Sequence, residues 1–281
     1  QNAWFVKVYD SNDVEISNNE LYLEDGYGVG IFQLSSDIYN SQIINNSFYH
    51  SGLTARYSIN VGSEGPREGD IFNSEVSGNQ LFIPVGDSTK HNIFIGYTKN
   101  PTVNDNYVYG GGYGIIVKGN DNAIVFNNNI YDNSRQAILD KASHNSLIFD
   151  NTFNCLHGKC ARVSNDPSSG REVLNSSWFN NTYYVEYEIP FEVSSPINPE
   201  INLITNENNT YHVGYSERVL ASILGQFYNL FELQENFEWD LDSRLFISGE
   251  IPEIRNIEVN DIGYNKATIR FSTSESSKAR I

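Results

Sequence analysis

Residues 125–130, Val-Phe-Asn-Asn-Asn-Ile, decide the fold of this chain, because their pattern recurs along the first two-thirds of the sequence. Each copy has an apolar residue, two further residues, an asparagine, one more residue and a second apolar residue. The marker asparagines are Asn19, Asn46, Asn79, Asn106, Asn128, Asn151 and Asn181, with a degenerate copy at Asn209. Successive markers of the seven full copies lie 22 to 33 residues apart. This spacing indicates a constant unit that carries loops of different length, as in repeat architectures.

The segments upstream of three consecutive markers are also in register. Residues 92–96, 114–118 and 137–141 read Asn-Ile-Phe-Ile-Gly, Gly-Ile-Ile-Val-Lys and Ala-Ile-Leu-Asp-Lys, and each begins 14 residues before a marker. Each copy therefore predicts a short strand, a turn and a second short strand that ends at the asparagine. A unit of this size cannot bury its own apolar side, so neighbouring copies must stack. Because the strands are short and no copy shows helical spacing, we expect an all-β fold, a parallel solenoid.

The marker asparagine has a structural explanation. A corner of the coil requires turn conformations that asparagine tolerates, and its side-chain amide both donates and accepts hydrogen bonds. Stacked copies lie about 4.8 Å apart, so each amide can bond to the next in a ladder. We therefore expect nearly all of these asparagines to be structural rather than catalytic.

Two pairs of motifs carry a family resemblance. Residues 114–117, Gly-Ile-Ile-Val, precede residues 127–130, Asn-Asn-Asn-Ile, and Ala137-Ile138 precede residues 149–153, Phe-Asp-Asn-Thr-Phe. They resemble the right-handed parallel β-helix repeats of pectate-lyase-like enzymes and NosD-type surface proteins. Asparagine-rich archaeal polysaccharide-degrading proteins, disaggregatase among them, are the nearest of these. The resemblance implies a right-handed parallel β-helix and a function on polysaccharides, and it is more specific for the fold than for an activity.

The sequence changes character after residue 183, so we expect three regions. They are the parallel β-helix over residues 1–183, a C-terminal capping region over residues 184–248 and a further module over residues 249–281. Within residues 249–281, a pair of segments alternates apolar and polar residues and resembles the first strands of a fibronectin type III module. Only about thirty residues of such a β-sandwich module are present.

The capping region contains a predicted helix. After Ser216, apolar residues from Leu220 to Phe231 recur at helical spacing, and a helix here would close the open end of the solenoid. Gly225 and the density of aromatic residues leave strands as the alternative.

The composition predicts a folded, acidic protein. The chain has 281 residues, 39% of them apolar, and 18 Lys and Arg against 35 Asp and Glu give a net charge of −17. No run of eighteen apolar residues occurs, so we expect no membrane span. Without a basic tract the chain is a poor nucleic-acid binder, because phosphate contacts dominate that affinity. We expect a monomer.

Several features favour an exported protein, either secreted or at the cell surface. Cys155 and Cys160 lie five residues apart and can close a disulfide loop in an oxidising compartment, with a pair of inert thiols as the alternative. His157 between them supplies too few ligands for zinc. The acidic surface, the Asn-X-Ser/Thr sequons and the absence of Met agree with export. Because Met is missing even at residue 1, we expect a segment of a longer or processed precursor.

Alternation along the in-register strands divides side chains between the interior and an outer face. The side chains expected inside are Ile93, Ile95, Ile115, Val117 and Ile138. An outer column is expected to contain Asn60, Phe94, Ile116, Leu139 and Arg162, beside a second column of Gly96, Lys118 and Lys141. The apolar portion of the outer column requires cover by a loop, a sugar face or a partner. Lys118 and Lys141 repel each other unless an anion or a carboxylate lies between them.

These positions predict a basic and aromatic strip where a polyanionic sugar chain could dock. The candidate catalytic residues are Lys118, Lys141, Arg162, Tyr113, Arg135 and His144. The candidate substrate-binding residues are Tyr97, His91, Phe94, Asn60 and Arg67. Elimination at a uronic acid needs neutralisation of its carboxylate and a base, and this strip offers side chains for both. Loops at residues 62–70 and 165–171 are expected to form walls on either side.

The primary hypothesis is therefore a polysaccharide lyase that acts on an acidic, uronic-acid-containing polysaccharide by β-elimination. The alternative is a non-catalytic cell-surface or carbohydrate-binding scaffold, on which the lysines are ordinary surface residues. A glycoside hydrolase is a third hypothesis, although the Asp-Asp, Gly-His-Gly and Arg-x-Pro-x-x-Arg motifs of related enzymes are missing. We expect no cofactor, or calcium at most. Copper handling is disfavoured, because the chain has no Met and five scattered His.

Overall fold

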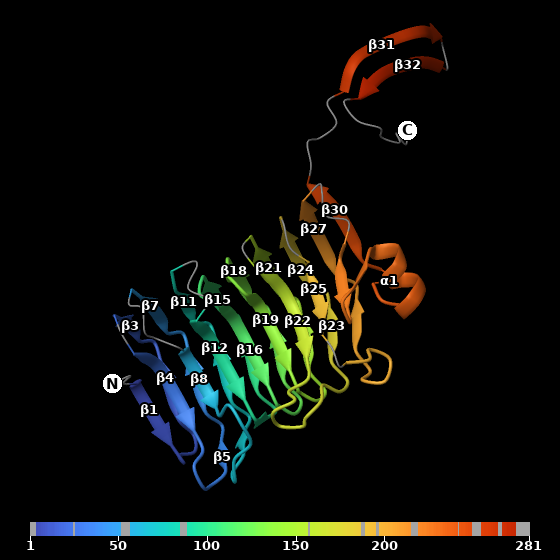
Figure 1. Ribbon diagram of the computed structural model, residues 1–281. Helices are drawn as coiled ribbons and strands as arrows, with labels where there is room; N and C mark the ends of the chain where they lie inside the picture. Colours follow the sequence, from blue (N-terminus) through green and yellow to red (C-terminus); the bar gives the residue numbers. More distant parts are fainter. Residues whose placement is uncertain are drawn as a thin grey trace.

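The computed structural model is a right-handed parallel β-helix (Figure 1). Each turn of the coil contributes strands to three long sheets in the order A, B, C, so strands distant in sequence pair in parallel. The predicted all-β parallel solenoid is therefore confirmed. The structure describes residues 4–24, 26–51, 57–84, 89–156, 158–186, 189–194, 197–214, 219–240, 242–248, 254–263 and 266–273, with side chains described up to residue 245.

Sheet A faces the reader in Figure 1 and has ten strands within the described residues. They are β1 (Trp4–Tyr9), β4 (Tyr27–Phe32), β8 (Tyr57–Gly62), β12 (His91–Gly96), β16 (Tyr113–Lys118), β19 (Gln136–Lys141), β22 (Lys159–Ser164), β25 (Phe191–Val193), β28 (Ala221–Ile223) and β29 (Gln226–Tyr228). Sheet B consists of β2 (Glu15–Ser17), β6 (Gln42–Ile44), β10 (Glu75–Ser77), β14 (Thr102–Asn104), β17 (Ile124–Phe126), β20 (Leu147–Phe149), β23 (Ser177–Phe179) and β26 (Thr205–Glu207).

Sheet C consists of β3 (Glu20–Leu23), β7 (Ser47–His50), β11 (Gln80–Phe82), β15 (Tyr107–Tyr109), β18 (Asn129–Tyr131), β21 (Thr152–Cys155), β24 (Thr182–Val185), β27 (Thr210–Gly214) and β30 (Arg244–Ser248). A small additional sheet joins β5 (Ile38–Tyr39), β9 (Ile71–Phe72) and β13 (Thr98–Lys99) at the turns between sheets A and B.

The coil has three strands per turn where the sequence predicts two. In the copy marked by Asn128, the two predicted strands are β16 and β17, and β18 is the third. This third strand follows the asparagine and escaped prediction because a single apolar residue, Ile130, marks it.

The marker asparagines form a hydrogen-bonded ladder at the turn between sheets B and C. Nδ2 of Asn128 donates to Oδ1 of Asn151 at 3.0 Å, and Oδ1 of Asn128 accepts from Nδ2 of Asn106 at 2.9 Å. Nδ2 of Asn128 also donates to the main-chain oxygens of Val103 and Phe126, both at 2.9 Å. The ladder runs without a break from the first marker to the degenerate copy at residue 209, which confirms the prediction.

The residue before the marker, rather than the marker itself, takes the left-handed turn conformation. Asn127 has a φ of 53°, and Asp105 and Asn180 have 56° and 55° in the equivalent positions. Asparagine and aspartate tolerate this region better than other side chains. A second, solvent-exposed asparagine ladder runs along the turns between sheets A and B, where Asn122 donates to Asn100 at 3.0 Å and accepts from Asn145 at 3.0 Å.

The interior of the coil is a single apolar cluster, and the predicted division of side chains holds. The residues expected inside, Ile93, Ile95, Ile115, Val117 and Ile138, are all fully buried in it. Those expected outside, Phe94, Ile116 and Leu139, form a separate cluster with Tyr57 on the outer face of sheet A. The pairs Asn60–Phe94, Phe94–Ile116, Ile116–Leu139 and Leu139–Arg162 follow the predicted register.

Asp140 is a carboxylate inside this apolar interior. Its side chain is fully buried, and Oδ2 accepts a hydrogen bond from the Ser176 hydroxyl at 2.6 Å. Burial raises the pKa of Asp140 to about 6, although hydrogen bonds from Ser176, Ser143 and Ser146 oppose the rise.

The C-terminal end of the described β-helix differs from the prediction. The helix expected from Leu220 to Phe231 is wrong in position, because β28 and β29 form an antiparallel hairpin there, as the alternative had it. Leu224 and Gly225 make its turn with φ values of 54° and 83°, which a helix cannot contain. The helix α1 (Leu230–Phe237) starts later, with Asn229 and Glu232 as a capping box.

The cap nevertheless covers the interior. Leu233 of α1 and Trp239 beyond it belong to the interior cluster, and the Trp239 indole donates to the main-chain oxygen of Ile204 at 3.0 Å. Sheets A, B and C continue past residue 183 through β25, β26 and β27. The division of the chain into three domains stays a prediction.

Three further expectations concern single features. Cys155 and Cys160 form a disulfide between β21 and β22, so of the two alternatives the bridge is the one observed. His157 lies outside the described residues. β31 (Ile254–Gly263) and β32 (Lys266–Thr273) pair antiparallel, and the fibronectin type III resemblance of this segment stays a prediction. Among the described residues, no helix has the length and apolar character needed to cross a bilayer.

Replacing Asn128 by Ala should destabilise the coil strongly. The change leaves buried donors and acceptors on both neighbouring coils unpaired, each at a cost of about 1–3 kcal/mol. Asn129→Ala is the matched control, because Asn129 is exposed and should change the free energy of unfolding by no more than about 0.5 kcal/mol. Denaturant unfolding followed by circular dichroism measures both. Equal effects of the two substitutions would contradict a stabilising role of the ladder.

Asp140→Asn should stabilise the protein at neutral pH and change its pH dependence. The pKa of Asp140 is raised in the folded state, so the native protein binds more protons than the unfolded chain between about pH 4 and pH 6. The free energy of unfolding therefore falls by up to about 3 kcal/mol as pH rises through this window. The Asn variant has no carboxyl group to titrate and should not show this fall. Thermal unfolding from pH 4 to pH 8 tests this, with the exposed Asp150→Asn as control. Parallel pH profiles of wild type and Asp140→Asn would refute the assignment.

Candidate functional site

The outer face of sheet A presents columns of side chains, because parallel register places equivalent residues one coil apart. The first column contains Trp4, Tyr27, Tyr57, His91, Tyr113, Gln136 and Lys159. The middle column contains Lys7, Gly30, Asn60, Phe94, Ile116, Leu139, Arg162 and Glu192. The third contains Gly62, Gly96, Lys118, Lys141 and Ser164. Most of the candidate site residues therefore lie on one face.

A carboxylate lies between the two candidate lysines, as their spacing requires. Nζ of Lys118 is 3.0 Å from Oδ2 of Asp166, and Nζ of Lys141 is 3.2 Å from Oδ1 of the same carboxylate, which is only 2% exposed. Burial alone would raise the pKa of Asp166, but hydrogen bonds from Ser168, Lys118 and Lys141 outweigh it and hold the pKa well below its usual range. The charges of both lysines are therefore largely compensated within the protein.

Tyr97 and the loop at residues 62–70 complete this arrangement. The Tyr97 hydroxyl donates to Oδ2 of Asp166 at 3.4 Å, and the Lys118 Nζ donates to the main-chain oxygen of Glu64 at 2.6 Å. The two long loops thus meet at Lys118, one through Glu64 and the other through Asp166. A cleft of about 290 Å³ lies beside them, and residues of both loops line it, among them Arg67 and Arg171. These contacts support the expected placement of the loops as walls.

Tyr113, His91 and Arg135 form a second group at the start of the strands. The rings of His91 and Tyr113 stack with centroids 4.8 Å apart, and Arg135 donates to the Tyr113 hydroxyl at 3.3 Å. The Arg135 guanidinium also lies 5.6 Å from the Tyr113 ring centroid. A phenol and a cation are therefore held side by side on the outer face.

The remaining candidates lie in less accessible or different places. Phe94 is 3% exposed and packs against Tyr57, so its ring is covered. Arg162 lies 3.7 Å from the Glu192 carboxylate, which Lys159 approaches to 2.9 Å.

His144 lies at the turn between β19 and β20 rather than on the strands of sheet A. There it is 3.4 Å from Asp121, which also pairs with Arg171. Burial, together with the charge of Arg171, lowers the pKa of His144, although the Asp121 carboxylate opposes this.

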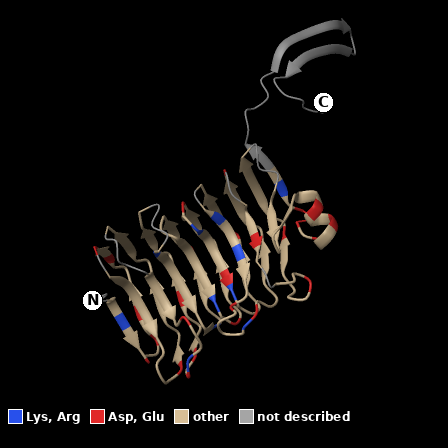
Figure 2. Cartoon of the chain, in the orientation of Figure 1, with Lys and Arg blue, Asp and Glu red and all other residues tan. Residues whose placement is uncertain are grey.

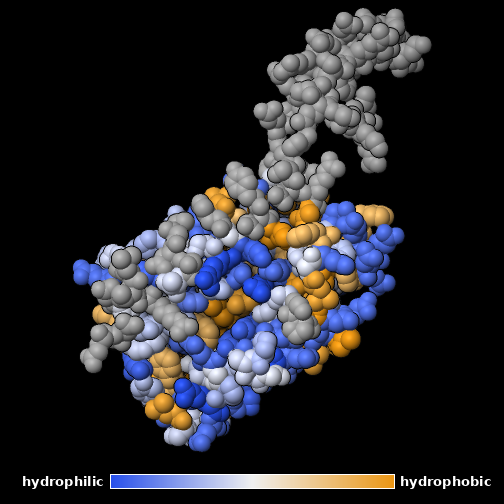
Figure 3. Space-filling view, viewed as in Figure 1, coloured by the Kyte–Doolittle hydropathy of each residue, from blue (hydrophilic) through white to orange (hydrophobic). Residues whose placement is uncertain are grey.

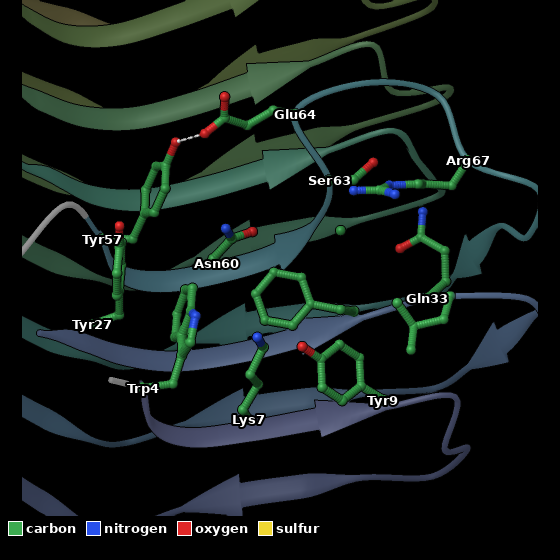
Figure 4. Close-up of a pocket in the computed structure, with 13 residues that line it drawn as sticks. Trp4, Lys7, Tyr9, Tyr27, Gln33, Tyr57, Asn60, Ser63, Glu64 and Arg67 are labelled. Atoms are coloured by element: carbon green, nitrogen blue, oxygen red, sulfur yellow. Dashed lines mark hydrogen bonds between the residues drawn. The ribbon is translucent and has the colours of Figure 1, made fainter. Parts of the chain in front are cut away.

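The N-terminal end of the face carries a larger cleft, of about 480 Å³ (Figure 4). Its residues come from β1, β4, β8 and the loops that follow β4 and β8. They are Trp4, Lys7, Tyr9, Tyr27, Phe32, Gln33, Leu34, Tyr57, Asn60, Gly62, Ser63, Glu64 and Arg67. Asn60 and Arg67, two of the candidate binding residues, therefore share this cleft. The volume is in the range of pockets that bind small molecules.

Two contacts shape this cleft. The Tyr57 hydroxyl donates to the Glu64 carboxylate at 2.6 Å, which holds the loop after β8 against the sheet (Figure 4). Gly62 lets the chain leave β8, because its φ is 91° and a Cβ there would meet the main-chain oxygen of Gly96. A glycine is thus required at the position where the later coils carry lysines.

Aromatic rings line the cleft mainly with their edges. Trp4 and Tyr27 stack at 4.7 Å, and the first column continues through Tyr57 and His91. Stacked rings cover each other's faces, and the hydroxyl of the buried Tyr57 is bonded to Glu64. Phe32 departs from this pattern, since it meets Trp4 edge-on at an angle of 75°.

The charge of this face contrasts with that of the whole protein. Its basic side chains are Lys7, Arg67, Lys118, Arg135, Lys141, Lys159 and Arg162, and the carboxylates that approach them are Asp166 and Glu192. Figure 2 shows Lys and Arg on several strands of sheet A, while helix α1 carries acidic residues. Figure 3 shows a hollow with apolar surface on this face, bordered by hydrophilic side chains. A basic and aromatic face on a protein of net charge −17 is therefore present.

Within the described residues, the donor set does not fit copper. The chain has no Met, and both cysteines are in the disulfide. No group of three or more His, Cys, Asp or Glu side chains converges within the region of the chain that the structure describes. Soft sulfur or clustered imidazole ligands, which copper prefers, are not assembled there. Calcium binding stays a prediction without a site among these residues.

Sequence reasoning missed Asp166 and the N-terminal part of the aromatic column, whereas Tyr113 and His91 of that column were among the predicted candidates. Asp166 lies in a loop that has no equivalent in other copies, so only the need for an anion between the lysines pointed to it. The sequence does contain a signal for the aromatic column. An aromatic residue is followed two and four positions later by apolar residues, and this pattern recurs at Trp4, Tyr27, Tyr57, His91 and Tyr113.

The fold and this face define a class of protein: a right-handed parallel β-helix with a basic, aromatic groove along one sheet. A model of the family described as "periplasmic copper-binding protein (NosD)" matches residues 62–218, which is more than half of the chain. The chain belongs to the NosD family.

Other comparisons give less. The chain is similar to the structure of endopolygalacturonase I from Stereum purpureum in complex with two galacturonate, with a TM-score of 0.41 and 12% identity over 79% of this chain and 83% of that chain. No curated protein matches the chain at a significant level.

Asp166→Asn should show that Lys118 and Lys141 need an anion between them. Loss of the carboxylate leaves two neighbouring cations, and the free energy of unfolding should fall by about 1–3 kcal/mol above pH 4. Because the pKa of Asp166 is lowered in the folded state, this contribution is present above the unfolded pKa and is lost as pH falls below it. Added sulfate should then raise the melting temperature of the variant more than that of the wild type.

Asp70→Asn is the matched control for this substitution. Asp70 pairs with Lys99 at 2.6 Å, but both side chains are about 40% exposed, so its loss should cost less than about 1 kcal/mol. An Asp166→Asn variant with wild-type stability and no response to sulfate would show that the carboxylate does not compensate the lysines.

Proposed function

We propose that this NosD-family β-helix is a carbohydrate-active protein that binds an acidic polysaccharide along the outer face of sheet A. The observation that carries the proposal is the gathering of basic side chains around a groove on a protein of net charge −17. A polyanion is the partner whose charge complements this face, because the molecule as a whole is strongly acidic.

The repeat of the face supports a polymeric ligand. Equivalent residues recur about every 4.8 Å along the coil axis, so the face offers similar groups several times in a row. Hydroxyls of Tyr27 and Tyr113, amides of Gln33 and Asn60, and the cations provide polar contacts next to ring edges. An extended sugar chain presents carboxylates, hydroxyls and C–H groups in the same repeating manner.

Cleavage by β-elimination is the second candidate function, and the Arg135–Tyr113 pair favours it. In this reaction a base takes the proton at C5 of a uronate, a C4–C5 double bond forms, the bond from C4 to the glycosidic oxygen breaks, and that oxygen leaves as a hydroxyl after it takes up a proton from a general acid or water. Tyr113 offers a hydroxyl and Arg135 a cation for the substrate carboxylate, at a mutual distance of 3.3 Å. Lys118, Lys141 and Arg162 are proposed to position the chain, because carboxylates of the protein already share their charge.

A location outside the cytoplasm belongs to the same proposal. It is supported by the Cys155–Cys160 disulfide and by the description of the family as periplasmic. The secreted and cell-surface alternatives share the same oxidising environment.

Arg135→Gln should weaken binding to polygalacturonate or alginate about tenfold, which corresponds to about 1.4 kcal/mol. The expected cause is the loss of one charge-assisted hydrogen bond, and the weakening should shrink as salt is added. Arg244→Gln is the control, since Arg244 is a cation in sheet C rather than on the sheet A face. Affinity is measured by isothermal titration calorimetry.

The same polymers with their carboxylates reduced to alcohols provide the second comparison. Equal affinity for the charged and reduced polymers, or equal effects of the two arginine substitutions, would contradict the proposal. Release of ultraviolet-absorbing unsaturated products by the wild type, lost in Tyr113→Phe, would support cleavage. Binding without any product would refute β-elimination and leave the binding function in place.

A further inference from the structure

Lys7 and Arg67 differ from Lys118, Lys141, Lys159 and Arg162, which pair with carboxylates of the protein. Both line the N-terminal cleft, and within the described residues no carboxylate pairs with either of them. Lys7 Nζ instead lies over the rings of Tyr9 and Phe32, 4.8 and 5.5 Å from their centroids. Aromatic faces position an ammonium group without neutralising it.

The same cleft contains two buried amides with unused hydrogen-bonding atoms. Gln33 is 2% exposed, and neither its Oε1 nor its Nε2 has a partner among the described residues. Asn60 is 4% exposed, and its Oδ1 likewise has no partner there. A buried polar atom without a partner costs about 1–3 kcal/mol, and native proteins contain few of them. Other buried side chains of the described residues also have one such atom, but Gln33 has two, and its position in a cleft beside Asn60 points to a ligand that completes their hydrogen bonds.

Cations, amides and one carboxylate lie at different places around the cleft. Figure 4 shows Lys7 on one side and Arg67 on the other, with Asn60 near Trp4 and Tyr57 and Gln33 near Arg67. Glu64 is held at the far wall by its hydrogen bond from Tyr57, so the cleft also has one anchored carboxylate. A ligand in the cleft thus meets cations, amides and a carboxylate within a volume of about 480 Å³.

We propose that the N-terminal cleft is the subsite that selects a uronate residue, with its carboxylate held by Lys7 and Arg67 and its ring hydroxyls held by Gln33 and Asn60. This inference rests on the proposed polysaccharide function and assigns its specificity to β1, β4 and β8 rather than to the Lys118–Lys141 pair. A hydroxyl both donates and accepts, which suits Gln33, whose amide group both accepts and donates.

The alternative anionic ligands fit less well. A fully ionised phosphate has only acceptor oxygens and would leave the acceptor atoms Oε1 of Gln33 and Oδ1 of Asn60 unsatisfied. It would also share the cleft with the Glu64 carboxylate. A uronate places one carboxylate near the cations while its hydroxyl groups can donate to the amide oxygens and to Glu64.

Gln33→Leu provides a test with two opposite readouts. Leu has a similar size and removes the unpartnered atoms, so the variant should unfold at a higher temperature than the wild type. Its affinity for a galacturonate or guluronate trimer should nevertheless fall tenfold or more. A destabilised or unfolded variant would not give this combination. An affinity equal to that of the wild type would overturn the assignment of Gln33.

Lys7→Met tests the carboxylate contact without relying on the amides. The variant should bind the charged trimer at least tenfold more weakly, yet bind the carboxyl-reduced trimer as the wild type does. Arg244→Gln again serves as the control outside the face. Equal losses for both trimers would show that Lys7 only shapes the cleft, and this would refute its proposed role.

The two proposals can fail separately. If the wild type binds no polyuronate, the function proposed for the whole face is wrong. If it binds polyuronate, and Arg135→Gln weakens binding while Gln33→Leu and Lys7→Met do not, the face stands and the cleft is not its selective subsite. Displacement of the trimer by inorganic phosphate at similar concentration would indicate a general anion site and overturn the uronate assignment.

Discussion

The buried asparagine ladder is the interaction on which the rest of the structure depends. Coils whose loops differ in length must still stack with identical register, and each marker amide enforces this by bonding to the coil before it and the coil after it. The same amide also ties down carbonyl oxygens of its own coil and of the preceding one, as Asn128 does with Phe126 and Val103. A slip of one residue would break all of these bonds at once and would turn interior side chains outward.

Because the register is the same in every coil, equivalent side chains lie next to one another along the axis. This stabilises some kinds of side chain and destabilises others. Apolar and aromatic residues gain from repetition, as in the stack of Phe126, Phe149 and Phe179 with centroids 5.2 and 4.9 Å apart. Repetition of charged residues is destabilising, because like charges one coil apart repel. Lys118 and Lys141 are tolerated since Asp166 lies between them. The sequence of a coil is therefore constrained by its neighbours on both sides.

This dependence on repetition explains what could be predicted from the sequence. The ladder, the inward isoleucines and the outer column of Phe94, Ile116 and Leu139 repeat, so their places followed from spacing alone. Even the need for a carboxylate between the lysines followed from it. The residue that meets the need, Asp166, could not be identified, because its loop occurs once and its approach to the sheet depends on tertiary contacts.

The end of the coil and the cleft lacked such repetition and were predicted less well. The apolar spacing from Leu220 to Phe231 suits a helix, but the turn at Leu224 and Gly225 converts the first half of this segment into a hairpin. The N-terminal cleft arises from the loops after β4 and β8, and its unpartnered amides become visible only when burial is known. Local pattern predicted the scaffold, whereas the site depends on where unique loops pack against it.

The distribution of compensated and uncompensated cations then separates the two halves of the face. Toward the C-terminal end, the protein supplies its own anions, since Asp166 serves two lysines and Glu192 serves Lys159 and Arg162. Lys7 and Arg67 toward the N-terminal end, and Arg135 beside Tyr113, have no carboxylate partner among the described residues. At net charge −17 the molecule repels a polyanion at distances where the whole charge acts, so attraction must be short-ranged and local. The proposed recognition therefore depends on cations that the protein leaves uncompensated, and two of them, Lys7 and Arg67, line the cleft formed by β1, β4 and β8.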